Sequence, residues 1–298
     1  MAKSAKADYT TFDEFLTYWA RERPDGVALE EGERRTTYGE AEALTRQLMA
    51  FLAAHGVTKG DRFAYLGKNS DRYFLLLYAA GRMGAVIAPI GWRLAPREIG
   101  YILGDTGSKL LLAEAEFLDT AKAVCGGMEG GPAVFDAVEA FTAARDMVLT
   151  AVTPPHPDEP VLQLYTSGTT GNPKGAQLSN RNLFSLRKPS VEADLPWQKF
   201  EATDCVLGAM PIAHIGGTGS GPIAVGNGIR IHILPEFTPL GALEAIEGGA
   251  TLLFLVPAAI QMMIQHPRAA ETDFSGLRYL MYGAAPMPLE LLKEAVRT

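Results

Sequence analysis

Short apolar runs alternate with segments of helical periodicity between residues 62 and 113, and this alternation constrains the fold more than any other feature. Residues 62–66, 85–89 and 109–113 have the length of strands, while residues 70–83 and 96–106 carry apolar positions at helical spacing. Parallel strands need long crossover connections, which helices usually supply. The alternation therefore predicts an α/β fold with a parallel-rich sheet flanked by helices on both faces.

The region before this alternation predicts a helix, a hairpin and a second helix. Residues 11–23 have apolar side chains at helical spacing, and Pro24 then stops the helix. Residues 27–29 and 36–38 flank a polar turn that contains Gly32, a pattern typical of a hairpin. Residues 39–55 follow as a helix, with Gly56 just past its end as a cap.

A proline-rich segment divides the sequence into two parts. Residues 153–160, Thr-Pro-Pro-His-Pro-Asp-Glu-Pro, contain four prolines and predict an irregular linker between residues 1–152 and 161–298. Beyond it we expect a strand at 161–165, a glycine-rich loop, a strand at 175–178 and a helix from about Ser179. Later segments predict a strand at 251–256 that turns at Pro257 into a helix, a strand at 277–282 and a helix at 288–297.

The overall composition excludes several classes of protein. The formal net charge is −7, and no run of lysine and arginine forms the basic stripe of a nucleic-acid binder. The pair Arg187 and Lys188 is expected on a solvated surface. Cys125 and Cys205 are too few for a disulfide framework, which favours reduced thiols and a cytoplasmic location. Residues 1–8 lack the apolar run of a secretory signal, and the apolar stretch 250–264 is too short for a transmembrane segment.

The most informative segment is residues 165–175, Tyr-Thr-Ser-Gly-Thr-Thr-Gly-Asn-Pro-Lys-Gly. Its glycines allow the backbone to approach a ligand closely, and its hydroxyls and Lys174 suit the oxygens of a triphosphate or pyrophosphate. The order of residues does not match the two common nucleotide fingerprints, G-x-x-x-x-G-K-[ST] and G-x-G-x-x-G. By composition alone, a merely polar and flexible hairpin loop is the competing interpretation.

The same eleven residues closely resemble the phosphate-loop signature of the adenylate-forming superfamily, which contains acyl- and aryl-CoA synthetases, luciferases and adenylation domains of peptide synthetases. Segments 37–40, 56–62, 84–89, 93–94 and 98–105 look like further landmarks in the family's order. The resemblance implies the large N-terminal domain of that superfamily, with parallel-rich sheets flanked by helices. Residues 1–152 and 161–298 would be two parts of this one domain.

The resemblance implies ATP and Mg²⁺ as ligands, with coenzyme A as co-substrate. Lys174 would be a catalytic residue and Thr166 a magnesium ligand. The β- and γ-phosphates would be bound by Thr166, Ser167, Gly168, Thr169, Thr170, Gly171 and Lys174.

Two later segments resemble further family motifs. Residues 210–217 are similar to the Pro-x-Phe-His motif near the acyl site of CoA ligases, which implies a catalytic role for His214 and acid binding by His214, Gly216 and Ala213. Ala213 stands where relatives commonly carry an aromatic residue, which predicts a roomy pocket. A purely structural histidine is the alternative. Residues 282–286 resemble a turn that packs on adenine, and they imply contacts from Gly283, Ala284, Ala285 and Pro286.

The sequence ends before the superfamily's Tyr-Gly-x-Thr-Glu motif and small C-terminal domain would appear. We therefore expect a truncated domain, incapable of thioester formation by itself and prone to self-association through an uncovered edge. The implied activity is ATP-dependent conversion of a carboxylic acid, fatty or otherwise hydrophobic, to an acyl-adenylate and then an acyl-CoA. The alternatives are an amino acid- or aryl acid-adenylating enzyme and a non-catalytic nucleotide- or acyl-binding fragment.

Overall fold

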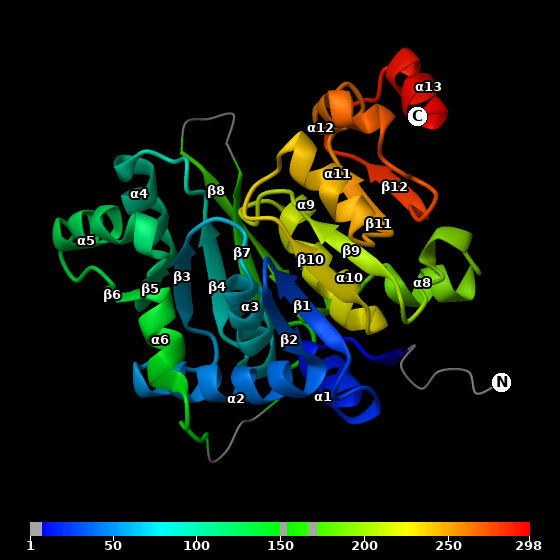
Figure 1. Cartoon of the computed structure of the whole chain (residues 1–298). Coiled ribbons are helices and arrows are strands. Elements are labelled where there is room, and N and C mark those ends of the chain that lie inside the picture. The colour runs from blue at the N-terminus through cyan, green and yellow to red at the C-terminus, as the bar shows by residue number, and fades with distance from the viewer. Residues whose placement is uncertain (1–7, 150–153, 167–171) are drawn as a thin grey trace.

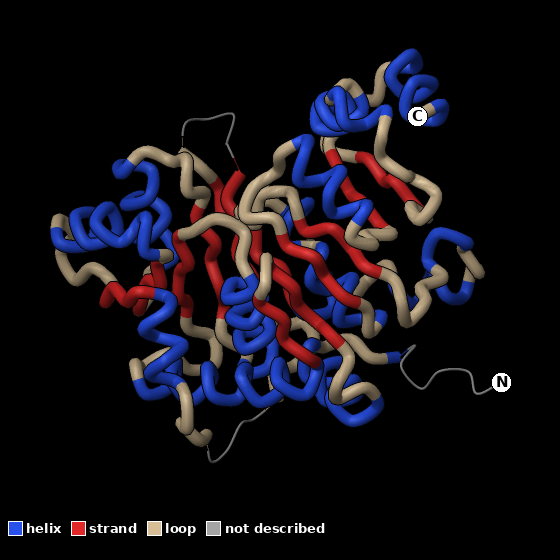
Figure 2. Tube along the Cα trace, in the orientation of Figure 1, coloured by secondary structure: helices blue, strands red, loops and turns tan. Residues whose placement is uncertain are grey.

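The computed structural model describes residues 8–149, 154–166 and 172–298. The described chain forms two six-stranded sheets surrounded and separated by helices (Figures 1 and 2). This arrangement confirms the predicted α/β class with parallel-rich sheets.

The first sheet collects strands from both ends of the sequence. Its spatial order is β12 (Tyr279–Tyr282), β11 (Leu252–Leu255), β9 (Cys205–Gly208), β10 (Arg230–Ile233), β1 (Val27–Glu31) and β2 (Arg34–Thr37). All neighbours in it are parallel except the hairpin of β1 and β2.

The second sheet has the same plan, with one antiparallel hairpin at an edge. Its order is β6 (Ala133–Asp136), β5 (Leu110–Ala113), β3 (Arg62–Leu66), β4 (Val86–Ile90), β7 (Pro160–Thr166) and β8 (Lys174–Ser179). Only β7 and β8 pair in antiparallel orientation among its described strands.

Thirteen described α-helices and three short 3₁₀ segments complete the fold. The 3₁₀ segments are Ala115–Phe117, Pro196–Gln198 and Pro267–Ala270. The helices are α1 (Phe12–Glu22), α2 (Tyr38–Ala54), α3 (Asp71–Met83), α4 (Pro96–Thr106), α5 (Leu118–Gly126), α6 (Ala137–Ala144), α7 (Asn180–Leu183), α8 (Arg187–Glu192), α9 (Ile215–Thr218), α10 (Ser220–Asn227), α11 (Pro239–Glu247), α12 (Pro257–Ile264) and α13 (Leu289–Arg297). None of these described helices is long and apolar enough to cross a membrane.

Helix α3 joins the two sheets. Every residue of α3 except Arg72 is buried, and the helix contacts β4 and β7 of one sheet and β1 of the other. A helix that is buried on all sides belongs to the interior of a protein and not to its surface. Ser70 caps its N-terminus and Gly84, with φ of 73°, ends it in the left-handed conformation that glycine adopts most easily. The sheets therefore share one core around α3.

Local periodicity predicted several elements well. The strand at 62–66 and the helix at 96–106 are confirmed, as are the early hairpin and the strand that turns at Pro257 into a helix. Helix α2 begins one residue earlier than predicted, because Thr37 is its cap and Tyr38 its first residue. The elements α5, β6 and α6, and those between 205 and 247, were not predicted.

Two predictions need correction. Pro160 belongs to β7 and pairs with Ser179, so the irregular segment ends before it. A proline is tolerated there because the first residue of a strand need not donate to the ladder. Arg187 is partly buried and not on a fully solvated surface: its guanidinium lies over the Phe15 ring at 5.1 Å, and burial lowers its pKa. Lys188 is exposed, as expected.

Candidate functional site

The β7–β8 hairpin presents two of the predicted phosphate-binding residues. Thr166 and Lys174 are direct partners across the hairpin, and both are exposed. Ser167, Gly168, Thr169, Thr170 and Gly171 lie outside the described residues, so their assignment stays a prediction.

Polar contacts of Tyr165 and Gln163 hold the part of β7 that leads into the loop of this hairpin. The Tyr165 hydroxyl donates to the Asp105 carboxylate and accepts a hydrogen bond from Gln163 Nε2 at 2.8 Å. A Cβ atom added to Gly175 would lie 2.4 Å from the same Gln163 nitrogen, so a larger residue there would displace the Gln163 amide from its place beside Tyr165. Burial and the nearby Asp105 carboxylate raise the pKa of Tyr165, which keeps its hydroxyl protonated as a donor. These contacts fix the conformation of β7 next to the loop that joins it to β8.

Lys174 carries a positive charge that no described residue neutralises. Within the described part of the chain, its ammonium group forms no ion pair and no side-chain hydrogen bond, whereas Lys109 and Lys188 each pair with an aspartate. An exposed, mobile ammonium group is suited to bind a phosphate as a point charge.

The predicted acid-binding residues lie on a tight turn after β9. The backbone N–H of His214 donates to the carbonyl of Pro211 at 3.0 Å, and the carbonyl of His214 accepts from Gly217 and Thr218 at the start of α9. A Cβ atom on Gly217 would lie 2.2 Å from the Met210 carbonyl oxygen, so the turn requires glycine there. The His214 side chain is exposed, and its imidazole forms no hydrogen bond to a described residue.

Phe254 lies between the segment predicted to bind the acid and the segment predicted to bind adenine. A Cβ atom on Gly216 would lie 3.0 Å from one edge of the Phe254 ring, and a Cβ atom on Gly283 would lie 3.1 Å from another edge. Both glycines therefore pack against one ring of β11. Sequence reasoning missed Phe254, because nothing in the pattern of its strand distinguishes it from its apolar neighbours.

The predicted adenine turn has an unusual backbone. Ala284 has φ of 64°, a left-handed conformation that costs an L-residue with a side chain roughly 1–2 kcal/mol. Ala284, Ala285 and Pro286 are exposed directly after β12. Strained backbone often accompanies ligand-binding turns, so the geometry agrees with a binding role.

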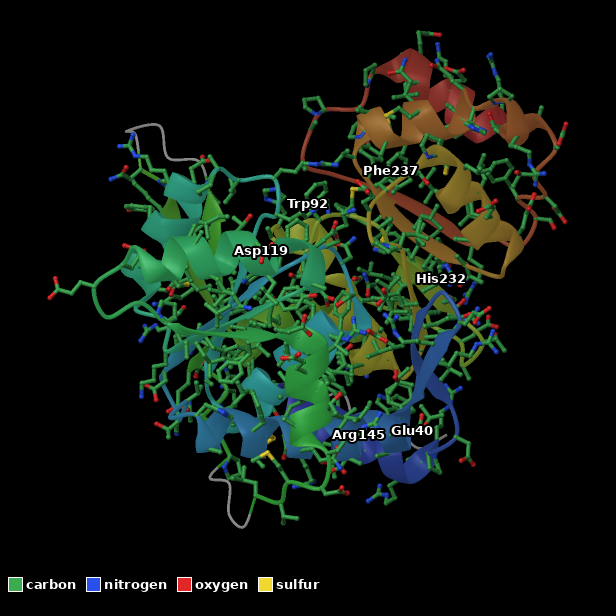
Figure 3. The ribbon with its side chains drawn as sticks, turned by 60° about the vertical axis from the view of Figure 1, so that its left-hand side comes forward. Glu40, Trp92, Asp119, Arg145, His232 and Phe237 are labelled. Carbon is green, nitrogen blue, oxygen red and sulfur yellow. The ribbon has the colours of Figure 1, made fainter. Side chains whose placement is uncertain are left out.

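Loops from both sheets meet where their parallel strands end. Lys68, in the loop after β3, pairs with Glu236 at 3.2 Å, and Arg93, after β4, pairs with the same carboxylate at 3.2 Å. The Trp92 ring lies 4.3 Å from the Arg93 guanidinium, and Figure 3 labels Trp92 and Phe237 in these loops. Crevices at the carboxyl ends of parallel strands are the usual ligand sites of α/β proteins. His214 and Gly283 follow the same ends of β9 and β12.

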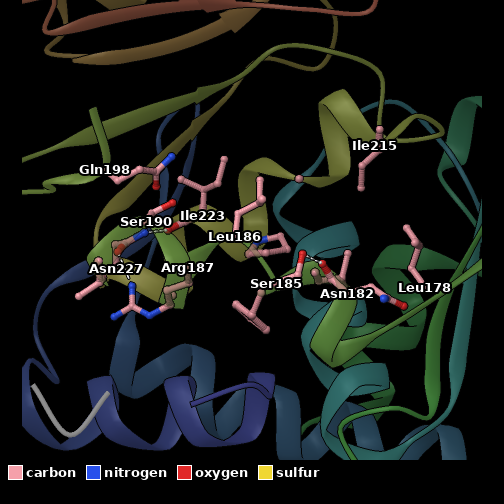
Figure 4. Close-up of a pocket in the computed structure, with 16 residues that line it drawn as sticks. Leu178, Asn182, Ser185, Leu186, Arg187, Ser190, Gln198, Ile215, Ile223 and Asn227 are labelled. Atoms are coloured by element: carbon pink, nitrogen blue, oxygen red, sulfur yellow. Dashed lines mark hydrogen bonds between the residues drawn. The ribbon is translucent and has the colours of Figure 1, made fainter. Parts of the chain in front are cut away.

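A cavity of about 320 Å³ lies beside the His214 turn (Figure 4). Helices α7, α8, α9 and α10 line it, and most of its surface is apolar. Ile215, the residue after His214, is part of the wall, and Arg187 with Asn227 forms a polar corner in which Arg187 Nη1 donates to Asn227 Oδ1 at 2.6 Å. No aspartate or glutamate is among the described residues that line it.

The donor groups for the predicted magnesium ion are few. The described residues contain no group of three histidine, cysteine or acidic side chains that could hold a metal. Thr166 offers one exposed hydroxyl oxygen at the end of β7. Magnesium in nucleotide sites is commonly bound by one or two protein oxygens together with phosphates and water. Thr166 therefore fits a metal carried by the nucleotide and does not form a metal site alone.

The chain is similar to known enzymes along nearly its full length. Residues 16–298 match the family of AMP-binding enzymes. The chain is 33% identical to a fatty acid–[acyl-carrier-protein] ligase, ScoC, of Streptomyces coeruleorubidus, over 96% of this chain and 56% of that protein. It is 34% identical to a feruloyl-CoA synthase of an Amycolatopsis species, over 91% of this chain and 54% of that protein.

A solved structure shows the same fold. The N-terminal domain of FACL13 from Mycobacterium tuberculosis superposes with a TM-score of 0.84 at 28% identity, covering 96% of this chain and 73% of that one. The chain spans about half the length of the curated relatives it matches. Because the family match covers almost the whole sequence, the chain belongs to the family of AMP-binding enzymes.

Proposed function

We propose that these 298 residues carry the nucleotide- and acid-binding part of an enzyme that activates a carboxylic acid with ATP and transfers it to a thiol. The substrate carboxylate attacks the α-phosphorus of ATP, a P–O bond forms, and pyrophosphate leaves with the electrons of the broken bond. The thiol of coenzyme A then attacks the acyl carbon as it loses its proton, and AMP leaves. Cytoplasmic location is part of the same proposal.

The residues of this chain would act through position and charge. The carboxylate of the substrate is the nucleophile, so the enzyme must align the two reactants and neutralise the phosphates. Lys174 and the hydroxyls near it would bind the β- and γ-phosphates, with Thr166 reaching the magnesium ion that accompanies them. Residues 283–286 would pack on adenine, and His214, Gly216 and Ala213 would hold the acid. The ammonium of Lys174, which pairs with no residue that the structure describes and lies in the segment that resembles the family's signature, carries this proposal most directly.

The cavity beside His214 supports a hydrophobic acid as substrate. Its wall is largely apolar, and an acyl tail buried there would be favoured by about 0.8 kcal/mol per methylene group. An amino acid would need a counter-charge for its ammonium group, and the described lining offers no carboxylate. A fatty or other hydrophobic acid therefore fits better than an amino acid, while an aryl acid remains the second candidate because the feruloyl-CoA synthase is a relative.

Binding measurements on residues 1–298 test the assignment of Lys174 without requiring turnover. In Lys174→Ala, the affinity for ATP with magnesium should fall about tenfold, while the affinity for AMP stays unchanged, because AMP lacks the outer phosphates. Lys122→Ala, an exposed lysine on α5, is the matched control and should change neither affinity. Calorimetric titration measures both. Equal losses for ATP and AMP, or none for either, would contradict the phosphate assignment.

The acid class is tested with acyl-sulfamoyl-adenosines, stable mimics of the acyl-adenylate. Long-chain and aryl derivatives should bind more tightly than the parent sulfamoyl-adenosine, whereas an aminoacyl derivative should not. Tightest binding of an aminoacyl derivative would favour the amino acid-adenylating alternative. Binding of nucleotides without any acyl preference would favour a non-catalytic nucleotide-binding role.

A further inference from the structure

The imidazole of His214 is placed by the backbone turn that carries it, and not by a hydrogen bond of its own to a described residue. It is exposed and forms no hydrogen bond to a described residue, so no side-chain partner fixes it. The turn from Pro211 to Thr218 sets the position and direction of the His214 side chain. Whatever holds this turn against the rest of the molecule therefore also positions His214.

Both backbone polar groups of Ile212, two residues before His214, form hydrogen bonds with side chains. The N–H of Ile212 donates to Asn69 Oδ1 at 3.1 Å, and the carbonyl of Ile212 accepts from the Thr218 hydroxyl at 2.6 Å. The Thr218 hydroxyl has one proton and gives it to Ile212. The Tyr73 hydroxyl, 2.6 Å away, must therefore be the donor to Thr218.

Asn69 ties this turn to two other loops. Its Nδ2 donates to the carbonyl of Leu234 at 3.0 Å, and its backbone N–H donates to the carbonyl of Pro235 at 3.0 Å. Asn69 follows β3 of one sheet, whereas Ile212 and Leu234 follow β9 and β10 of the other. One side chain, 4% exposed, thus connects the carboxyl ends of strands from both sheets.

The setting makes these bonds strong restraints. Asn69, Tyr73 and Thr218 are all buried, and hydrogen bonds in a low-dielectric interior are costly to break. Tyr73 lies in the first turn of α3, the helix packed between the two sheets, so its hydroxyl is fixed by the core itself. By contrast, the ion pairs of Lys68 and Arg93 with Glu236, which span the same gap, involve a carboxylate that is 39% exposed.

We infer that Asn69 and Tyr73 are positioning residues, which hold the Ile212 backbone and thereby set the place of the His214 imidazole toward the acyl group. This inference rests on the proposed function for the role of His214. The network itself is independent of that role. A shift of the turn of one ångström would move the imidazole away from the acid while leaving the nucleotide contacts of the β7–β8 hairpin intact.

The first experiment measures affinity for a long-chain acyl-sulfamoyl-adenosine and for AMP in residues 1–298. Asn69→Ala and Tyr73→Phe should each lower the affinity for the acyl compound about tenfold and leave the affinity for AMP unchanged. Tyr78→Phe is the matched control, because Tyr78 lies on the same buried helix and its hydroxyl donates to Gly221 on α10 and not to the His214 turn. It should change neither affinity.

A double-mutant cycle separates positioning from a general structural effect. If Tyr73 acts through His214, Tyr73→Phe should have no further effect on acyl affinity in a His214→Ala background. Additive losses would overturn the inference. Tyr73→Phe removes one hydroxyl and keeps the ring, so it retains the packing of α3 even if Asn69→Ala does not fold.

Nuclear magnetic resonance of the histidine side chains tests the network apart from any ligand. The sequence has five histidines, and His214→Gln assigns the His214 resonance. Tyr73→Phe should shift or broaden the His214 ring signals in the free protein, and Tyr78→Phe should leave them in place. If the unmutated chain bound no acyl-sulfamoyl-adenosine, the proposed function would fail while this measurement still decided the inference. Unmoved His214 signals in Tyr73→Phe would contradict it.

Discussion

Ala284 shows how a single residue can mark a site. Its φ of 64° places an L-residue in the left-handed region, where the Cβ atom crowds the following carbonyl. The residue is exposed and lies directly after β12, beside Gly283, which packs on Phe254. Backbone strain of this kind clusters at ligand-binding sites, which agrees with the proposed contact of this turn with adenine.

Relieving this strain should stabilise the protein. In Ala284→Gly, the free energy of unfolding should rise by about 0.5–1 kcal/mol, because the strain exceeds the extra entropy that glycine gives the unfolded chain. Ala285→Gly is the control: Ala285 has no positive φ, so the same change there should lower the free energy of unfolding. Urea unfolding followed by circular dichroism measures both. Equal destabilisation of the two variants would show that Ala284 is unstrained.

The elements α1, α2 and α3 are joined by a buried arginine. Arg82, on α3, is fully buried, with its Nε 2.9 Å from Asp13 Oδ1 on α1 and its Nη2 3.0 Å from Glu42 Oε1 on α2. Its Nη1 also donates to the Thr45 hydroxyl at 2.6 Å. A buried charge is tolerated only when it is paired and fully hydrogen-bonded. This network therefore specifies how the three helices pack.

The network should make stability depend on pH in the acid range. Burial alone would raise the pKa of Glu42, but its hydrogen bond and charge interaction with Arg82 lower the pKa below the ordinary value. A lowered pKa in the folded state means that the stabilisation is complete above the unfolded pKa, about 4.3, and is lost as the pH falls through the folded value. Glu42→Gln should thus cost about 1–3 kcal/mol at pH 7, and this difference should shrink as the pH falls.

Urea unfolding at pH 7, 5, 4 and 3 gives the comparison. Glu244→Gln, at an exposed position on α11, should show a small difference at every pH. A difference between the unmutated protein and Glu42→Gln that stays constant down to pH 3 would rule out the carboxylate of Glu42 as the source of the stabilisation.

At the scale of the whole molecule, the loops that follow the carboxyl ends of parallel strands in the two sheets contact one another. The β7–β8 hairpin, where we propose phosphate binding, belongs to one sheet, whereas the His214 turn and the proposed adenine turn follow strands of the other. Among the described residues, no hydrogen bond or ion pair joins Lys174 to either turn. The relative position of these two parts of the candidate site is therefore set by the packing of both sheets against α3.

A polypeptide of residues 1–298 alone should bind ligands without completing the reaction. It spans 56% of the length of the ScoC ligase, and we propose that groups beyond this share are needed to align the carboxylate with the α-phosphorus. The surface of β12 and α13 exposes Tyr282, Leu289 and Val296, so self-association is expected as well. Acyl-CoA formation should be absent with ATP, magnesium, coenzyme A and a panel of acids. Turnover comparable to that of a full-length relative assayed in parallel would refute the proposal.

Local sequence patterns determined the elements whose signals are local. The strand before Pro257, the cap at Ser70 and the helix ended by Gly84 depend on periodicity and on residues within a few positions. The elements α5, β6 and α6 were missed because they are short, and half of α6 is alanine, so that their apolar positions give weak periodicity. The β7–β8 hairpin, the predicted phosphate-binding element, was located from sequence because its two strands are close together in the chain.

Tertiary structure alone decided which distant residues meet. Asn69 and Ile212 are separated by 143 positions, and their hydrogen bond depends on the sheets packing on opposite sides of α3. Phe254 contacts Gly216 and Gly283 because β11 lies between β9 and β12 in the sheet, an order that no local pattern specifies. Arg187 contacts the ring of Phe15, which lies far from it in the sequence. Periodicity determines which face of an element is apolar, whereas the choice of neighbour is made by the packing of the whole core.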